Sequence, residues 1–242
     1  MKGWPRKKTF RVQNSTIRPS GMELIDRVPI PGGTGELGLY RRGSDLLIRI
    51  MGGQDLMNTL THGSEDALGE ITCTGLGQRS LARVLVGGLG MGFTLSAALG
   101  QLGSDAEVIV AELVPGVVAW NRGPIGSYAD HPLRDPRVTV QEVDVAIVIK
   151  AASTGFDAIL LDVDNGPEGL TREDNQWLYS RAGLASSFQA LRPGGVLGVW
   201  SAGADRAFSK RLHKIGFVVT EVAVRAHRGK GARHLIWLAR KP

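Results

Sequence analysis

A glycine cluster between a short apolar run and a helical pattern constrains the fold of this chain more than any other stretch. Val84, Leu85 and Val86 are predicted to form a buried strand. The glycines that follow are Gly87, Gly88, Gly90 and Gly92. They permit a tight turn and a close approach of a ligand to the backbone. Residues 91–102 then place their apolar side chains on one helical face. A strand, a glycine turn and a helix N-terminus in this order are typical of sites for a nucleoside or its phosphates.

An acidic residue at the end of the next predicted strand narrows the class of ligand. Residues 108–111 form a second apolar run, and Glu112 follows it, twenty residues beyond Gly92. This spacing suits a carboxylate that accepts hydrogen bonds from ribose hydroxyls. Phe93 replaces the third glycine of the dinucleotide fingerprint. A pyrophosphate-binding NAD site is therefore disfavoured, and a nucleoside without phosphates fits better. A tight turn with no ligand is the alternative interpretation of the glycines.

The charge of the chain is divided between its ends and its body. The net charge is +6, with +6 in residues 1–18, +8 in residues 205–242 and −8 in residues 19–204. Basic ends are usually solvated, and contact with nucleic acid is the alternative. The basic C-terminal segment lacks interleaved aromatic residues for base stacking, so nucleic acid is a possible partner but not a favoured one. The acidic body favours a cationic ligand, such as a sulfonium or a polyamine.

Cysteine content and hydropathy indicate the compartment. Cys73 is the only cysteine, which excludes an internal disulfide and a cysteine-cluster metal site. No apolar run approaches the roughly 20 residues that span a bilayer, and no apolar stretch follows the N-terminal charges. We therefore expect a cytoplasmic protein with no membrane attachment and no metal.

The chain divides into a lead, a small β-element and a main domain. Residues 1–33 are basic and then rich in proline and glycine, which predicts a flexible lead. Residues 34–60 are predicted to form a small β-element containing a hairpin. Residues 61–242 are assigned to one α/β domain, which opens with a helix over 64–76. The strands predicted before this domain are residues 22–28, 36–40 and 46–51.

Strands and helices alternate through the main domain. The predicted strands are residues 84–86, 108–111, 137–140, 156–162, 196–200, 217–224 and 234–239. The predicted helices begin at 91, 115, 171, 183 and 204. The last two strands flank a basic loop, 225–233, and suit antiparallel neighbours. The pattern predicts a doubly wound, mostly parallel sheet of seven strands with a reversed hairpin at one edge. This is the plan of the class I S-adenosylmethionine-dependent transferase fold.

Polar residues gather at the carboxyl ends of the predicted strands. Ligands bind at that edge of a doubly wound sheet. The residues placed there are the glycines of the turn, Glu112, Asp144, Asp162 and Ser201. Structural needs alone do not require so many strands to finish in such residues, so we expect the functional site at this edge.

The motifs from Glu36 to Ala202 resemble the spermidine synthase (polyamine aminopropyltransferase) family. The features occur in the same order in both. They are the leading hairpin, the Gly-Gly-x-Gly turn, Glu112 at a strand end, Asp135-Pro-Arg-Val138 followed by Asp144, and Phe156-Asp-x-Ile-Leu-Leu-Asp162 continuing to Gly166-Pro167. The resemblance implies a small N-terminal β-hairpin element before the transferase fold, and it implies a homodimer.

The resemblance also implies roles for individual residues. The cofactor is expected to contact Gly88, Gly90, Gly92 and Asp162. Glu112 is expected to bind the ribose, and Asp144, with Val145 beside it, to accept a hydrogen bond from the adenine amino group. Asp162 is the implied catalytic proton acceptor that readies the attacking amine. Asp164 is a second implied catalytic carboxylate.

Three departures from the family pattern leave the transferred group open. Gly90 stands where the family has the Asp that holds the aminopropyl amine. Asn165 replaces a second acid, with Asp164 one place earlier. Leu68-Gly69 precede Glu70 where a Tyr-His pair is expected near a Glu. The cofactor is therefore S-adenosylmethionine or its decarboxylated form. One hypothesis is aminopropyl transfer to an amine. The alternatives are a methyltransferase acting on a small molecule or RNA, and a degenerate, non-catalytic nucleoside-binding protein.

Overall fold

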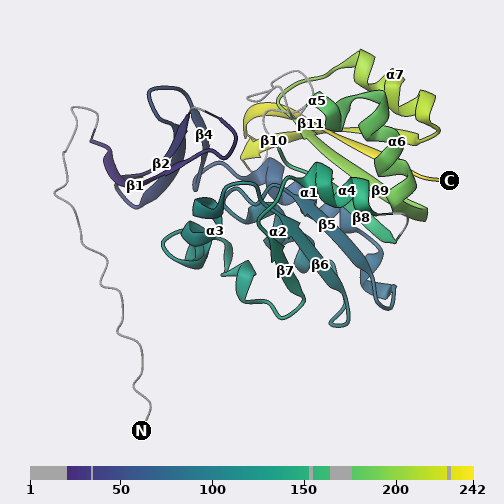
Figure 1. The fold of residues 1–242 in the computed structure, drawn as a ribbon, viewed down its shortest axis with the longest axis horizontal. Helices are drawn as coiled ribbons and strands as arrows, with labels where there is room; N and C mark the ends of the chain where they lie inside the picture. Colours follow the sequence, from purple (N-terminus) through teal and green to yellow (C-terminus); the bar gives the residue numbers. More distant parts are fainter. Residues whose placement is uncertain (1–20, 34, 153–154, 164–175, 228–229) are drawn as a thin grey trace, which may run out of the picture.

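The computed structural model describes residues 21–33, 35–152, 155–163, 176–227 and 230–242. These residues form a small antiparallel sheet and a large, mostly parallel sheet (Figure 1). The small sheet has the order β1-β2-β3-β4, with every neighbouring pair antiparallel. Its strands are β1 (Glu23–Pro29), β2 (Glu36–Arg42), β3 (Asp45–Ile50) and β4 (Asp55–Asn58).

The small sheet confirms the predicted hairpin and corrects the boundary before it. β2 and β3 pair across a turn at Gly43, whose φ of 63° lies in the left-handed region. β1 confirms the strand predicted over residues 22–28 and pairs with β2, so the end of the range 1–33 assigned to a flexible lead belongs to the small sheet. β4 was not among the predicted strands, although it lies within the range 34–60 assigned to the small β-element.

The large sheet confirms the predicted fold class. Its order is β10-β11-β9-β8-β5-β6-β7. The neighbours from β9 to β7 are parallel, whereas β11 is antiparallel to both β9 and β10. The strands are β5 (Arg83–Gly87), β6 (Glu107–Ala111), β7 (Val138–Gln141), β8 (Phe156–Leu161), β9 (Leu191–Ser201), β10 (Val218–His227) and β11 (Lys230–Arg240).

Helices cover both faces of the large sheet, and β5 shows why. Val84 and Val86 point into one apolar core with Leu68 of α1, while Leu85 points into a second core with Ile149 of α4. A central strand buried on both faces reads as a continuous apolar run. The helices are α1 (Gly63–Cys73), α2 (Phe93–Leu99), α3 (Pro115–Arg122), α4 (Val145–Ala151), α5 (Gln176–Tyr179), α6 (Arg181–Ala190) and α7 (Arg206–Ile215). None of these helices is long and apolar enough to cross a membrane.

Several predicted boundaries are wrong for local reasons. α2 begins only at Phe93 because Gly90 and Gly92 have φ values of 52° and 87°, which a right-handed helix excludes. α4 was missed. The predicted basic loop 225–233 lies mostly in β10 and β11, since an edge hairpin with an exposed face accepts charged side chains. The helix predicted from residue 171 begins outside the described residues.

β9 begins at Leu191, five residues before the strand that was predicted from residue 196. The segment Arg192-Pro-Gly-Gly195 forms an irregularity in the strand, because Phe156 pairs with Leu191 but Ala158 pairs with Val196.

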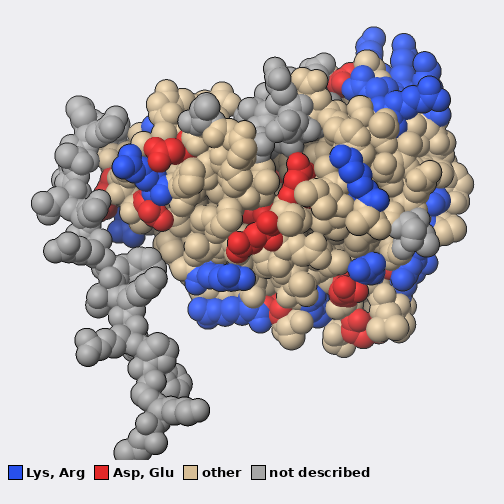
Figure 2. All heavy atoms as spheres, in the orientation of Figure 1, with Lys and Arg blue, Asp and Glu red and all other residues tan. Residues whose placement is uncertain are grey.

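Lys and Arg side chains gather over α7 (Figure 2). Arg206, Lys210 and Lys214 are exposed there, which agrees with the basic C-terminal charge.

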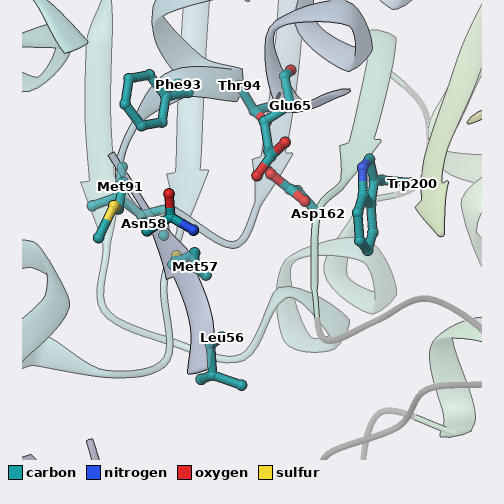
Figure 3. A pocket seen from close by; sticks show the side chains of 11 residues that line it. Leu56, Met57, Asn58, Glu65, Met91, Phe93, Thr94, Asp162 and Trp200 are labelled. Carbon is teal, nitrogen blue, oxygen red and sulfur yellow. Dashed lines mark hydrogen bonds between the residues drawn. The ribbon is translucent and has the colours of Figure 1, made fainter. Parts of the chain in front are cut away.

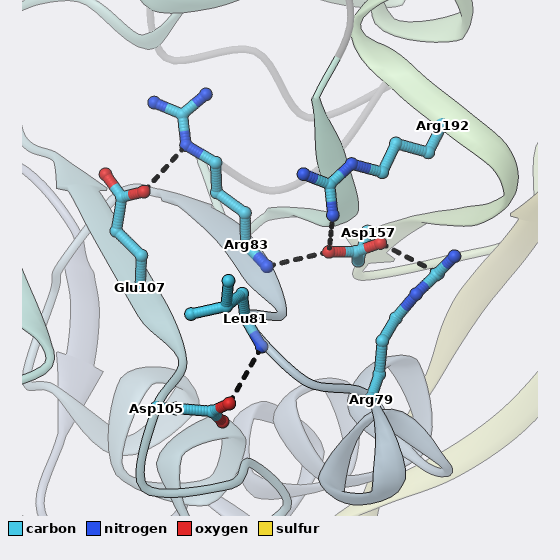
Figure 4. Close-up of polar contacts among 7 residues, drawn as sticks. All are labelled: Arg79, Leu81, Arg83, Asp105, Glu107, Asp157 and Arg192. Atoms are coloured by element: carbon cyan, nitrogen blue, oxygen red, sulfur yellow. Dashed lines mark hydrogen bonds and ion pairs between the residues drawn. The ribbon is translucent and has the colours of Figure 1, made fainter.

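A polar network ties together the amino ends of the central strands, at the edge opposite the glycine turn. Asp157 of β8 is fully buried and accepts a hydrogen bond of 2.7 Å from the Arg83 amide. It also forms ion pairs of 2.7 Å with Arg79 and 2.8 Å with Arg192 (Figure 4). Arg83 further pairs with Glu107 of β6 at 2.9 Å. These contacts hold β5, β6 and β8 together at their amino ends, and they do not involve the carboxyl ends, where the glycine turn lies.

The small sheet is held against the carboxyl end of the large one. The Trp120 indole of α3 donates a hydrogen bond of 2.9 Å to Asp26 of β1. Gly116 of α3 lies so close to Val28 that an added Cβ would come within 2.3 Å of it. This close packing brings β4 over the glycine turn.

Candidate active site

The glycine turn and Glu112 form one rigid unit. Glu112 is buried directly after β6, and its two carboxylate oxygens accept hydrogen bonds of 2.8 Å from the amides of Leu89 and Val114. Burial raises the pKa of this carboxyl, while the backbone N–H donors oppose that rise. A Cβ on Gly88 would lie 2.4 Å from the Asp162 carbonyl oxygen. Only glycine therefore lets the turn pack against the end of β8.

Asp144 and Val145 lie beside this unit at the start of α4. The Asp144 side chain caps the helix by accepting a hydrogen bond of 2.8 Å from the Ala146 amide. Val145 is buried, and its side chain lies 2.7 Å from where a Cβ on Gly87 would stand. One Asp144 oxygen is thus fixed by the helix cap, a role that was not predicted from the sequence.

A first cavity brings most of the predicted nucleoside-binding residues together. Six residues that the sequence predicted for the site line this cavity: Gly88, Gly90, Glu112, Asp144, Val145 and Asp162. Apolar side chains from the small sheet, among them Ile48 and Ile50 of β3, also line this cavity. We call this the nucleoside cavity. Gly92 does not line it and packs against Asn121 instead. Asp164 lies outside the described residues.

A second cavity adjoins the first, and the two share Leu56, Met57, Gly90 and Asp162. We call it the acceptor cavity. Its remaining lining residues are Asn58, Glu65, Leu89, Met91, Phe93, Thr94 and Trp200 (Figure 3). Asp162 therefore stands at the junction of the two cavities.

Hydroxyl groups hold the two carboxylates of the acceptor cavity. Thr94 Oγ1 donates a hydrogen bond of 2.6 Å to Asp162 Oδ2, and Ser64 Oγ donates one of 2.6 Å to Glu65 Oε2. Burial raises the pKa of Asp162, although the Thr94 hydrogen bond opposes the rise. Burial, and then the charge of Asp162, raise the pKa of Glu65 to about 7. Both groups thus hold protons more tightly than exposed carboxyls do.

Met57 fills the space next to Gly90. A Cβ on Gly90 would lie 2.9 Å from Met57 Sδ. The sequence reading placed the family's amine-binding Asp at this position. The structure supplies a thioether there, and the described lining of the acceptor cavity holds only two carboxylates, Glu65 and Asp162.

Sequence reasoning missed Glu65, Thr94 and Trp200. The acid compared with the family's leading helix was Glu70, but Glu70 is exposed on α1 and Glu65 faces Asp162. Trp200, at the end of the strand predicted over residues 196–200, received no role in the site and lines the acceptor cavity. Ser201, expected at the site, is buried and accepts a hydrogen bond from the Gly203 amide. A signal for Glu65 existed, because it is an acid in the first turn of α1, two residues after Gly63, but only the fold shows what it faces.

His62 stacks on Phe93, one of the residues that line the acceptor cavity. The ring centroids are 3.9 Å apart, and Nδ1 of His62 lies 2.7 Å from Asp66 Oδ2. These contacts fix the start of α1, from which Glu65 projects. Within the described ranges no three His, Cys, Asp or Glu side chains are grouped as a metal site.

The sheet order, the glycine turn and the acids at the strand ends define a class I S-adenosylmethionine-dependent transferase fold. A spermidine synthase from Thermotoga maritima superposes with a TM-score of 0.69 at 14% identity, covering 98% of this chain and 83% of that one. A Burkholderia thailandensis 1,6-didemethyltoxoflavin-N1-methyltransferase, solved with S-adenosylhomocysteine, gives a TM-score of 0.52 at 20% identity, covering 74% and 78%. The resemblance to the spermidine synthases that the motifs indicated is thus confirmed for the fold.

A curated protein matches part of the sequence more closely. Putrescine N-methyltransferase 1 of Nicotiana tabacum is 35% identical over 116 residues. The match covers 48% of this chain and 29% of the tobacco protein. No family model matches the chain.

Proposed function

We propose that this protein is a transferase that binds an S-adenosylmethionine-type nucleoside and transfers an alkyl group from its sulfur to an amine. One observation carries the proposal: Asp162 lines both the nucleoside cavity and the acceptor cavity. A carboxylate at that junction can contact an acceptor amine while the donor carbon lies beside it. The fold and the curated relative support the same class of reaction.

In the nucleoside cavity, Glu112 is proposed to accept hydrogen bonds from the ribose hydroxyls. Its carboxylate is fixed by two backbone amides before any ligand arrives, which reduces the entropy lost on binding. Asp144 is proposed to accept from the adenine amino group, with Val145 packing against the base. The apolar wall from the small sheet excludes water from the ring.

In the acceptor cavity, Asp162 is proposed to orient the amine and to take its proton. The nitrogen lone pair attacks the carbon next to the positive sulfur, and the breaking C–S bond leaves its electron pair on a neutral thioether. The leaving group needs no acid, so a base is the only proton-transfer group that the reaction requires. Thr94 fixes the Asp162 oxygen at 2.6 Å.

The surroundings of Gly90 favour methyl transfer over aminopropyl transfer. The aminopropyl donor lacks the carboxylate of S-adenosylmethionine, so its ammonium group needs a carboxylate from the protein, and Met57 occupies that place here. The 35% identical relative is named as an N-methyltransferase of putrescine. Aminopropyl transfer is the second candidate, because the spermidine synthase fold superposes over 98% of the chain.

Calorimetric binding of the two donors separates these candidates. We expect purified protein to bind S-adenosylmethionine at least about tenfold more tightly than the decarboxylated form, a difference of about 1.4 kcal/mol. The opposite preference would establish aminopropyl transfer as the working function. Binding of neither donor would overturn the proposal. The homodimer and the cytoplasmic location stay predictions.

A further inference from the structure

The acceptor cavity is acidic on two sides that come from distant parts of the chain. Glu65 is on α1, and Asp162 follows β8. Figure 3 shows their carboxylates turned toward one another across the cavity. Lys, Arg and His are absent from the described lining. Two neighbouring carboxylates without a cation cannot both ionise without a large cost in free energy.

The polar neighbours of the pair do not remove this cost. The hydroxyls of Thr94 and Ser64 each hold one carboxylate oxygen. Each hydroxyl is neutral, so it stabilises a charge without cancelling it. The second oxygen of each carboxylate makes no hydrogen bond with a described residue and is available to a ligand.

The charged groups on α1 add to the negative potential. Asp66 raises the pKa of Glu65 further, and its Oδ2 lies 2.7 Å from Nδ1 of His62. The His62 ring stacks on Phe93 and is not part of the lining of the cavity.

Among the described residues, the elements packed around α1 bring no cation to the pair. β4 contributes Asn58 and β9 contributes Trp200, which are uncharged. On β11, burial lowers the pKa of His234, whose ring lies 4.8 Å from that of Trp200. On β10, the Arg225 guanidinium donates to the Gly231 carbonyl at 3.1 Å, along the exposed hairpin.

We propose that Glu65 is a second substrate-binding carboxylate: in the empty cavity Glu65 and Asp162 share one proton, and the ammonium group of the acceptor replaces that proton. This inference rests on the proposed function. It adds Glu65 to the residues that bind the acceptor, and it adds the release of one proton when the acceptor binds. The ammonium then lies between two ionised carboxylates, which neutralise it and position it beside the donor carbon.

The proton balance of one cycle follows from this exchange. The protonated amine enters and one proton leaves to solvent. The bound ammonium next gives a proton to Asp162 and becomes a neutral nucleophile. Attack forms the N–C bond, breaks the S–C bond and yields a neutral thioether and a protonated product amine. The product leaves as a cation, and the proton on Asp162 restores the shared state of the empty cavity. The raised pKa of Glu65, about 7, places the exchange near neutral pH.

Infrared titration of the free protein tests the shared proton without any substrate. We expect a protonated carboxyl band that disappears as the pH rises through about 7. In Glu65→Gln the band should be weaker and should disappear at a lower pH than in the wild type, because Asp162 then has no carboxylate with which to share a proton and only burial raises its pKa. Glu70→Gln is the matched control: Glu70 is on the same helix but exposed, and its removal should leave the band unchanged. A wild-type protein without the band, or a control that loses it, would overturn the inference.

Calorimetry tests the exchange itself. Putrescine is titrated into protein loaded with S-adenosylhomocysteine, at pH 7 in two buffers of different ionisation enthalpy. We expect about half a proton released per amine in the wild type, because the pKa lies near the pH. Glu65→Gln should release almost none and bind putrescine about tenfold more weakly. Equal proton release in both proteins would contradict the exchange. If putrescine does not bind to any variant, the proposed amine acceptor is wrong, and the infrared band still decides whether the proton is shared.

Discussion

The two cavities differ in how their carboxylates are held. In the nucleoside cavity, backbone N–H groups fix Glu112 and Asp144 through hydrogen bonds of 2.8 Å. In the acceptor cavity, side-chain hydroxyls hold Glu65 and Asp162, and the two carboxylates face one another. The first pair is stabilised by the fold before a ligand binds. We propose that the second pair becomes stable in its charged form only when a cation binds.

We infer from this difference that the two cavities bind different kinds of ligand. A neutral sugar and base need fixed acceptors in fixed directions, which backbone donors supply at low entropic cost. An amine must be captured as a cation and then deprotonated, so its site needs carboxylates whose pKa responds to occupancy. Asp162 lines both cavities, and we propose that it couples the two events.

Asp162→Asn should cause the largest effect, because it removes the proposed base and keeps the shape. We expect kcat for transfer to an amine to fall by about 10²–10⁴. Affinity for S-adenosylmethionine should change by less than about threefold, which calorimetry on the same sample can measure. Turnover near the wild-type value would show that Asp162 is not the base, and the proposed difference in role between the two cavities would then be wrong.

Glu112→Ala should affect the nucleoside cavity selectively. It removes the ribose acceptor and leaves the Leu89 and Val114 amides without their partner. We expect the Kd for S-adenosylmethionine to rise by about 10- to 100-fold, from a loss of about 1.5–3 kcal/mol in charged hydrogen bonds. The amine KM at saturating donor should stay within about threefold. An equal loss for both ligands would show that Glu112 acts through folding.

Glu65 should make the stability of the free protein depend on pH. Its folded pKa of about 7 exceeds the usual 4.5, so the folded state retains a proton that the unfolded state has lost between those values. The free energy of unfolding should therefore fall as the pH rises from 4.5 to 7, by at most about 3 kcal/mol. Urea unfolding at pH 5 and pH 8 measures this fall. Glu65→Gln should show a smaller fall than wild type, and Glu70→Gln the same fall. A pH dependence that is unchanged in Glu65→Gln would refute the assignment.

Restoring an acid beside the donor should produce the smallest effect. Met57→Ala with Gly90→Asp places a carboxylate where Met57 Sδ now lies, and Asp tolerates the left-handed φ of 52° there. We expect the preference between the donors to shift toward decarboxylated S-adenosylmethionine by about tenfold. Met57→Ala alone is the control and should leave the preference unchanged. No shift in the double variant would mean that Gly90 does not set donor choice.

The nucleoside cavity could be predicted from sequence, whereas the acceptor cavity could not. The glycine turn, Glu112 and Asp144 of the nucleoside cavity follow strands that end at one edge of a parallel sheet. The order of these strands in the sequence therefore predicts that the residues lie close together. Glu65 and Trp200 reach the site through packing of α1 and β9 against other elements, and neither sits in a local motif. Boundaries failed where tertiary contacts overrode local signals, as at β4 and in the hairpin of β10 and β11.

The central claim is alkyl transfer to an amine at the junction of the two cavities. The most direct test incubates the protein with S-adenosylmethionine and putrescine and identifies the products by mass spectrometry. The account predicts a methylated amine and S-adenosylhomocysteine in equal amounts, with Asp162→Asn inactive under the same conditions. Tight binding of the donor, with no transfer to putrescine or to other small primary amines from either donor form, would contradict it.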